Sequence, residues 1–120
     1  MDILVVDDSK TMRLIVQRAI RMAGYRTLQV AEAENVPQAM EKLREAQPRL
    51  ILSDWNMPEM SGLDFLKQIR ENDKKTAFGF ITSERASETR VLAMTEGATF
   101  MLSKPFTPED IREALEPILG

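Results

Sequence analysis

Four charged residues of this chain each follow directly on a short apolar run: Asp7 and Asp8 after residues 3–6, Asp54 after residues 50–53, and Lys104 after residues 100–103. Such runs are typical of strands buried in a parallel sheet. If the three strands lie in one sheet, all four side chains emerge at its carboxyl-terminal edge, where open α/β sheets bind their ligands. Carboxylates gathered there with an ammonium group predict a site for a metal ion and a phosphoryl group.

The three aspartates would need a counter-ion if they lie together. A single aspartate after a strand is usually a turn former or a helix cap. Three like charges within a few ångströms, however, disfavour joint ionisation by several pKa units, so the arrangement costs stability. A divalent cation removes that cost, and Mg²⁺ takes carboxylate, water and phosphate oxygens as ligands. We therefore expect Mg²⁺ as the cofactor, and Mn²⁺ would accept the same donors.

Other side chains near this edge suit a phosphoryl group. Lys104 supplies a point charge for phosphate, and the hydroxyls of Thr82 and Ser83 add hydrogen-bond donors after another apolar run. The chain contains no histidine and no cysteine, so it offers no Ser–His or Cys–His pair of nucleophile and base. The chemistry left open is attack of an aspartate carboxylate on phosphorus.

Composition narrows the class of protein further. A chain of 120 residues allows one domain, which we expect to span residues 1–120. The net charge is −3, with 16 basic residues scattered among 19 acidic ones, so no basic stripe indicates direct nucleic-acid binding. No apolar stretch approaches the roughly 20 residues of a membrane span. Without cysteines or a signal peptide, the sequence favours a cytoplasmic location and no membrane insertion.

Strand-like and helix-like segments alternate five times along the chain, without a linker between them. This alternation predicts an α/β fold, a doubly wound five-stranded parallel sheet with five helices. We place the strands at residues 3–6, 27–31, 50–53, 78–82 and 100–103. Helices should begin after the caps Ser9, Asn35, Ser61 and Thr107, with a further helix over residues 87–96. Pro37 and Pro108 fall in first turns, where proline is tolerated.

Apolar residues at helical spacing predict the buried faces of the first two helices. In the first helix these residues are Met12, Ile15, Val16, Ala19, Ile20 and Ala23. In the second helix they are Ala39, Met40, Leu43 and Ala46.

Taken together, the motifs resemble the receiver domains of two-component response regulators. In order along the chain they are Asp7-Asp8, Asp54-Trp55-Asn56-Met57-Pro58 with Gly62, Thr82, Gly97-Ala98 and Lys104-Pro105-Phe106. The match covers the whole chain, and its Asp-Trp-Asn-Met-Pro and Lys-Pro-Phe-Thr versions look like the stand-alone chemotaxis type. The resemblance implies a flavodoxin-like sheet with strand order 2-1-3-4-5 and a cis peptide before Pro105.

The resemblance also implies how the acidic residues divide their roles. Asp54 would be the phosphoacceptor, taking its phosphoryl group from a histidine kinase or a small phosphodonor. Asp8 and Asp54 would ligate Mg²⁺ together with the backbone carbonyl of Asn56. Asp7 would hold a metal-bound water.

Three further residues receive roles in the same way. Lys104 would pair with the phosphoryl group. Thr82 would donate its hydroxyl to that group, and its movement would report phosphorylation to the outer surface. Asn56 and Glu84 stand at the two positions that tune self-dephosphorylation in the family.

The chain departs from the family at one switch position. The family usually has Tyr or Phe three residues before the lysine, and here that position is Met101. The aromatic residue, Phe100, stands one residue earlier, and a one-residue step along a strand reverses the face. We therefore expect Phe100 not to replace the missing ring, and the aromatic part of the switch to be altered.

These expectations describe a signalling switch in chemotaxis or motility, which catalyses only its own phosphorylation and dephosphorylation. A protein target would dock on the fourth helix, fifth strand and fifth helix. One alternative is a receiver cut from a larger DNA-binding response regulator. A second is a Mg²⁺-dependent aspartyl-phosphate phosphatase, which needs an acid where Asn56 stands. A third is a flavodoxin-type cofactor binder, whose neutral phosphate loop differs from Asp7-Asp8.

Overall fold

Five parallel strands form the centre of the molecule. The computed structural model describes all 120 residues. The strands are Ile3–Val6 (β1), Val30–Ala33 (β2), Leu50–Asp54 (β3), Ala77–Thr82 (β4) and Phe100–Ser103 (β5). They pair in the order β2-β1-β3-β4-β5. The predicted fold class and strand order are therefore confirmed.

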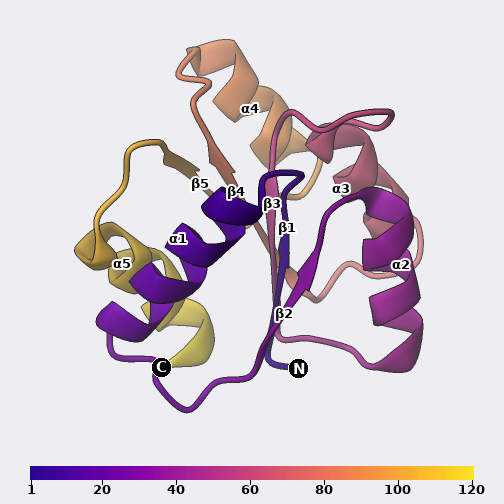
Figure 1. Cartoon of the computed structure of the whole chain (residues 1–120). Helices are drawn as coiled ribbons and strands as arrows, with labels where there is room; N and C mark the ends of the chain where they lie inside the picture. Colours follow the sequence, from indigo (N-terminus) through magenta and orange to yellow (C-terminus); the bar gives the residue numbers. More distant parts are fainter.

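Helices cover both faces of this sheet. They are Lys10–Met22 (α1), Val36–Glu45 (α2), Gly62–Arg70 (α3), Ser87–Thr95 (α4) and Pro108–Leu119 (α5). The helices α1 and α5 lie side by side on one face, and α2 and α3 lie on the other (Figure 1). Ala93 of α4 packs into the same core as α2 and α3. The result is a three-layer sandwich, as doubly wound sheets require.

Side-chain alternation along the strands divides the core into two halves. On β1, Ile3 and Val5 pack against α1 and α5, while Leu4 and Val6 face α2 and α3. Phe65, Phe78 and Phe80 are the largest side chains of the second half, and all three are fully buried. Because both faces of the central strands are covered, the polar side chains can emerge only at the strand ends.

Side-chain caps begin four of the five helices, as predicted. The side-chain oxygens of Ser9, Asn35, Ser61 and Thr107 each accept a hydrogen bond from the backbone N–H three residues later. Only the Thr107 cap is a complete capping box, in which the side chain of Asp110 also binds the Thr107 N–H. Ala86, before α4, offers no side-chain cap. The start of α4 therefore lacks the capping hydrogen bond that stabilises the starts of the other four helices.

The second strand begins later than predicted. We expected residues 27–31, but β2 starts at Val30, which pairs with Ile3. The main-chain groups of Gln29 bind Asp2: the Asp2 carboxylate accepts the Gln29 N–H at 2.8 Å, and the Gln29 carbonyl accepts the Asp2 N–H at 2.7 Å. The pairing with β1 therefore sets where the ladder begins, whatever the β propensity of the preceding residues.

Two predicted buried positions are also wrong. Ile15 of α1 is 47% exposed, and the buried face of that helix includes Arg13 instead. Ala46 lies beyond the end of α2, in extended and exposed backbone. The predicted buried face counted apolar residues alone and did not include Arg13, since arginine is rarely buried unless it is paired.

Gly79 and Phe100 form a packed cross-strand pair between β4 and β5. The two residues stand opposite each other in the ladder. A Cβ atom on Gly79 would lie 2.2 Å from Cζ of the Phe100 ring, so the ring occupies the space where a side chain would be. The ring thereby shields backbone that glycine would otherwise leave open.

We expect Gly79→Ala to destabilise the fold by roughly 1–3 kcal/mol, the usual cost of overpacking a filled site. In a Phe100→Leu background the same change should cost much less, since alanine in a strand is otherwise favoured over glycine by about 0.5–1 kcal/mol. Urea unfolding of the two single variants and the double variant, followed by far-UV circular dichroism, measures the coupling. An equal cost of Gly79→Ala in both backgrounds would contradict the packing argument.

Candidate metal and phosphoryl site

The loop after β1 carries the first two acidic residues. Asp7 is only 5% exposed, whereas Asp8 is exposed to solvent. The Ser9 N–H donates to Oδ1 of Asp7 at 2.9 Å, and Ser9 in turn caps α1. The start of α1 therefore holds the Asp7 carboxylate in place.

Asp54 and Lys104 reach the same point from the ends of β3 and β5. The Lys104 Nζ lies 3.6 Å from Oδ1 of Asp54 and 3.8 Å from Oδ2 of Asp7. Carboxylate oxygens of Asp7, Asp8 and Asp54 all lie within 4.8 Å of one another. The structure thus brings together all four charged residues that the sequence placed at the strand ends. The peptide between Lys104 and Pro105 is cis, as the resemblance implies.

The electrostatic environment disfavours ionisation of Asp7. Burial is the largest effect and raises the pKa of its carboxyl above the ordinary value. The hydrogen bond from the Ser9 N–H lowers this pKa, and the Asp54 charge raises it again. Lys104 and Asp8 make smaller contributions of opposite sign, and the net pKa shift is upward. Burial and repulsion by the neighbouring carboxylates together therefore outweigh the Ser9 N–H and Lys104 in setting the pKa of Asp7.

This donor set fits a hard divalent cation. All of its side-chain donors are carboxylate oxygens. Mg²⁺ and Mn²⁺ both accept such oxygens as ligands. Asp8 is exposed, so a bound cation could keep waters on that side. An added dication would also relieve the repulsion from Asp54 and Asp8, which adds to the effect of burial in raising the pKa of Asp7.

The segment between β3 and α3 folds back over Asp54. The Trp55 N–H donates to Oδ1 of Asp54 at 2.8 Å, and the Gly62 N–H donates to the Trp55 carbonyl, also at 2.8 Å. A Cβ atom on Gly62 would lie 2.2 Å from the Asp54 carbonyl oxygen, so the close return of the chain requires glycine here. Asn56 is exposed within this segment. The Trp55 ring packs edge-on against Phe80 of β4, with ring centroids 4.9 Å apart.

Thr82 ends β4 and is fully buried. Its Oγ1 accepts a hydrogen bond from the Glu84 N–H at 3.1 Å, and Glu84 itself is exposed. Ser83 between them is also exposed. The hydroxyl proton of Thr82 remains available for donation because this hydrogen bond uses only an oxygen lone pair.

Met101 and Phe100 lie on opposite faces of β5, as expected from their spacing. Met101 is 6% exposed and packs in the core half that contains Phe80 and Ala93. The Phe100 ring lies in the other half, over Gly79. Phe100 therefore cannot take the place of an aromatic residue at position 101.

Arg13 is a buried residue next to the site that we did not predict. Its Nη1 donates to the carbonyl oxygen of Asp7 at 2.6 Å, and its Nε donates to Glu32 at 2.9 Å. One signal was present in the sequence: Arg13 precedes Val16 by three residues and Ile20 by seven, which places it on the buried face of α1.

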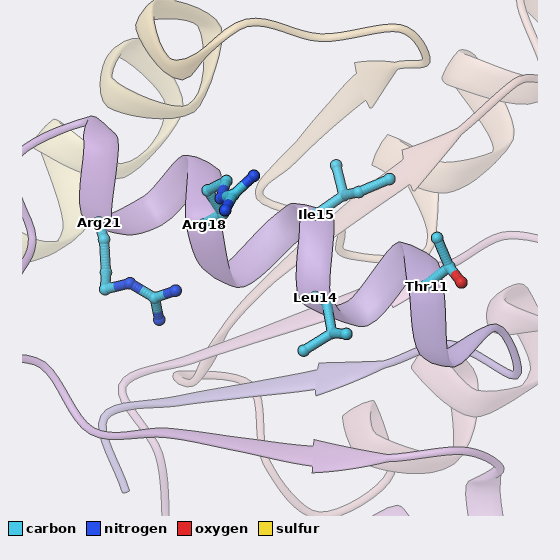
Figure 2. Close-up of a pocket in the computed structure, with 5 residues that line it drawn as sticks. All are labelled: Thr11, Leu14, Ile15, Arg18 and Arg21. Carbon is cyan, nitrogen blue, oxygen red and sulfur yellow. The ribbon is translucent and has the colours of Figure 1, made fainter.

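A hollow of about 310 Å³ lies away from these carboxylates, on the outer side of α1. Figure 2 shows the five side chains around it, all from this one helix: Thr11, Leu14, Ile15, Arg18 and Arg21. It includes none of the acidic residues and none of the predicted phosphate contacts.

None of the five helices combines the length and apolar character needed to cross a bilayer.

Comparison with known proteins gives a consistent result. A model of the response regulator receiver domain matches residues 3–116. The chemotaxis protein CheY1 of Helicobacter pylori is 41% identical, over 100% of this chain and 98% of the relative. A chemotaxis protein CheY homolog of Campylobacter jejuni is 37% identical, over 100% of this chain and 93% of the relative. The structure of Vibrio cholerae CheY4 superposes with a TM-score of 0.86 at 35% identity and covers 98% of both chains.

We expect Asp7→Asn to stabilise the metal-free protein at neutral pH. Carboxylate oxygens of Asp7 and Asp54 lie within 4.8 Å of each other. Two like charges at that distance repel by roughly 3 kcal/mol at an effective dielectric of about 20, and Lys104 offsets part of this, so we expect a gain of roughly 1–2 kcal/mol. Because the folded-state pKa of Asp7 is raised above 3.8, the gain should be complete above that raised pKa and vanish below pH 3.8. Urea unfolding in EDTA across this pH range measures it.

Glu113→Gln is the matched control, since it removes one negative charge from an exposed position on α5. That substitution should change the free energy of unfolding by less than about 0.5 kcal/mol. A loss of stability in Asp7→Asn at pH 7 would show that the carboxylate is well compensated without metal.

Proposed function

The chain belongs to the response regulator receiver family, and from this membership we propose that Asp54 accepts a phosphoryl group from a histidine kinase in a Mg²⁺-dependent reaction. Phosphorylation would then change the binding of a downstream protein, most simply in chemotaxis or motility signalling. Receivers of this type are signalling switches and not conventional enzymes. A cytoplasmic location and a single domain over residues 1–120 remain predictions.

The observation that carries the proposal is the position of the Asp54 carboxylate among the other charged groups. Its Oδ1 already accepts the Trp55 N–H and lies 3.6 Å from the Lys104 ammonium group. Its Oδ2 has no hydrogen-bond donor, which makes it the better nucleophile of the two. In the transfer, a bond would form from this oxygen to phosphorus while the bond to the leaving group breaks, and the leaving group keeps that electron pair.

Asp8 and Asp54 would ligate the Mg²⁺ together with the backbone carbonyl of Asn56, and Asp7 would hold a metal-bound water. A bound Mg²⁺ would supply charge neutralisation for the carboxylates and the phosphoryl oxygens. Lys104 would also stabilise the transferred group, because its ammonium group lies close to both Asp7 and Asp54. Asn56 and Glu84 are both exposed, and at these positions they would tune attack by water, as in the family.

The switch would begin at Thr82. Its hydroxyl would turn toward the phosphoryl group, and this movement would disturb the bond that it accepts from the Glu84 N–H. That bond links the end of β4 to the segment that enters α4. On α4, Val91, Leu92 and Met94 are exposed apolar side chains, which supports a docking face for a partner on α4, β5 and α5.

Incubation with acetyl phosphate and Mg²⁺ should add one hydroxylamine-labile phosphoryl group to the wild-type protein. Intact-mass spectrometry should show about 80 Da added, which is the mass of one phosphoryl group on one carboxylate. Asp54→Asn should lose at least nine tenths of this labelling, because an amide oxygen is a poor nucleophile.

Asp64→Asn, on the exposed first turn of α3, is the control and should label like wild type. Equal labelling of Asp54→Asn and wild type would remove the assignment of the phosphoacceptor. Sustained hydrolysis of several unrelated phosphate monoesters would instead point to a phosphatase.

Met101→Tyr should leave phosphorylation at Asp54 within about twofold but enlarge the change that it causes on α4 and β5. Methionine has three rotatable side-chain bonds and adapts to several packings, so it separates two conformations less sharply than a ring. A modification shifts a two-state equilibrium only by its differential free energy for the two states. Amide hydrogen exchange over residues 84–104, with and without beryllium fluoride and Mg²⁺, measures the change.

Met94→Tyr, an exposed position on α4, controls for the aromatic substitution itself. If Met101→Tyr and wild type respond equally, the switch in this protein does not depend on an aromatic residue at position 101.

A further inference from the structure

Arg13 is a buried cation that the proposed phosphoryl transfer does not use. We propose that Arg13 and its partner Glu32 are a positioning pair, which sets the geometry of the divalent cation site through the main chain of Asp7. This inference rests on the proposed function, because it concerns the affinity of the same site for Mg²⁺.

Arg13 connects three separate parts of the structure. It projects from the first turns of α1 and is only 9% exposed. Its Nη1 donates to the Asp7 carbonyl at 2.6 Å, and its Nε donates to Oε1 of Glu32 on β2 at 2.9 Å. The planar guanidinium group suits this task, since its donors are held in one rigid fork.

The Asp7 carbonyl is an effective point of control over both acidic residues. It belongs to the planar peptide unit that joins Asp7 to Asp8. Rotation of that unit would change the direction of the Asp8 side chain relative to that of Asp7, and both lie in the carboxylate cluster. A hydrogen bond that fixes this unit therefore fixes the angle between the predicted ligand Asp8 and Asp7, the predicted holder of a metal-bound water.

The peptide unit before Asp7 is anchored to the same neighbouring strand. The Asp7 N–H donates to the Ala33 carbonyl at 3.1 Å, so the ladder between β1 and β2 extends to this residue. Glu32, the residue before Ala33, receives the guanidinium group from Arg13. Both peptide units around Asp7 are thus held by β2, one directly and the other through the arginine.

Glu32 is suited to its part because it stays charged. The hydrogen bond from Arg13 lowers the pKa of its carboxyl, while partial burial acts in the opposite direction. Its side chain is 40% exposed, so the pair has one buried member and one solvated member. An ion pair that served only to join α1 to β2 would not need the second contact, from Arg13 to the Asp7 carbonyl.

The test is a Mg²⁺ titration of the full chain at a temperature where circular dichroism shows each variant to be folded. Trp55 fluorescence and the amide chemical shifts of Asp7 and Asp8 report binding. Arg13→Met should raise the Mg²⁺ dissociation constant about tenfold, the lower end of the effect of losing a group that orients a metal ligand. At saturating Mg²⁺ the rate of phosphorylation by acetyl phosphate should stay within about twofold of wild type.

Three further variants make the result specific. Glu32→Ala should weaken Mg²⁺ binding severalfold, and it decides the matter if Arg13→Met does not fold. Arg13→Lys should fall between wild type and Arg13→Met, since one ammonium group cannot reproduce the fork. Arg18→Met removes the same charge from an exposed position on α1, beside the hollow in Figure 2, and should bind Mg²⁺ like wild type.

The metal-free protein provides a second reading. In Arg13→Met, the amide of Asp8 should exchange faster with solvent than in wild type, because the peptide unit that contains it has lost its anchor. Folded Arg13→Met and Glu32→Ala proteins that bind Mg²⁺ with the wild-type constant would overturn the inference and leave the proposed function intact. Failure of the wild-type protein to bind Mg²⁺ at all would overturn both.

Discussion

Mutual repulsion among three carboxylates is the constraint on which the rest of the site depends. Their oxygens lie within 4.8 Å of one another at the ends of β1 and β3, where Asp7 is buried, Asp54 is half-buried and Asp8 is exposed to water. Lys104 offsets part of the charge from β5, and backbone N–H groups of Ser9 and Trp55 bind the carboxylates of Asp7 and Asp54. The fold tolerates the remaining imbalance because the two core halves stabilise the strands that carry it. Because its negative charge is only partly compensated, the site is suited to binding a dication and a phosphoryl group.

The segments around the site differ in how many hydrogen bonds fix their position. Asp7 is anchored on all sides: its N–H by Ala33, its carbonyl by Arg13 and its carboxylate by the Ser9 N–H. The segment after β4 is different, since Ser83 and Glu84 are exposed and α4 has no side-chain cap. The groups proposed to bind metal are therefore on the rigid side of the sheet edge, and those proposed to report phosphorylation are on the less supported side. This division suits a switch, because local rearrangement needs few contacts to break.

The β4–β5 pair shows how packing narrows what the switch can be. Phe100 covers Gly79 on the face of α1 and α5, so its ring is committed to the core. Met101 is buried on the opposite face beside Phe80, whose ring also packs against Trp55, next to the proposed phosphoacceptor. An adaptable side chain thus stands where relatives in the family usually carry a ring, within contact distance of the same aromatic core. Met101 would influence signalling through packing, because its side chain has no hydroxyl group that could form a hydrogen bond.

The sequence alone determined the parallel α/β class, the helix caps and the meeting of Asp7, Asp8, Asp54 and Lys104 at one edge, because these follow from local periodicity and from the position of each residue at a strand end. It also placed Phe100 and Met101 on opposite faces, since alternation along a strand is a local rule. Only the tertiary structure decided where β2 begins, which side of α1 Ile15 occupies and what Arg13 binds. Those features depend on contacts between segments far apart in the chain: the pairing of Gln29 with Asp2, and the meeting of Arg13 with Glu32. A buried arginine is stable only where its partners are, and their positions are set by the packed sheet.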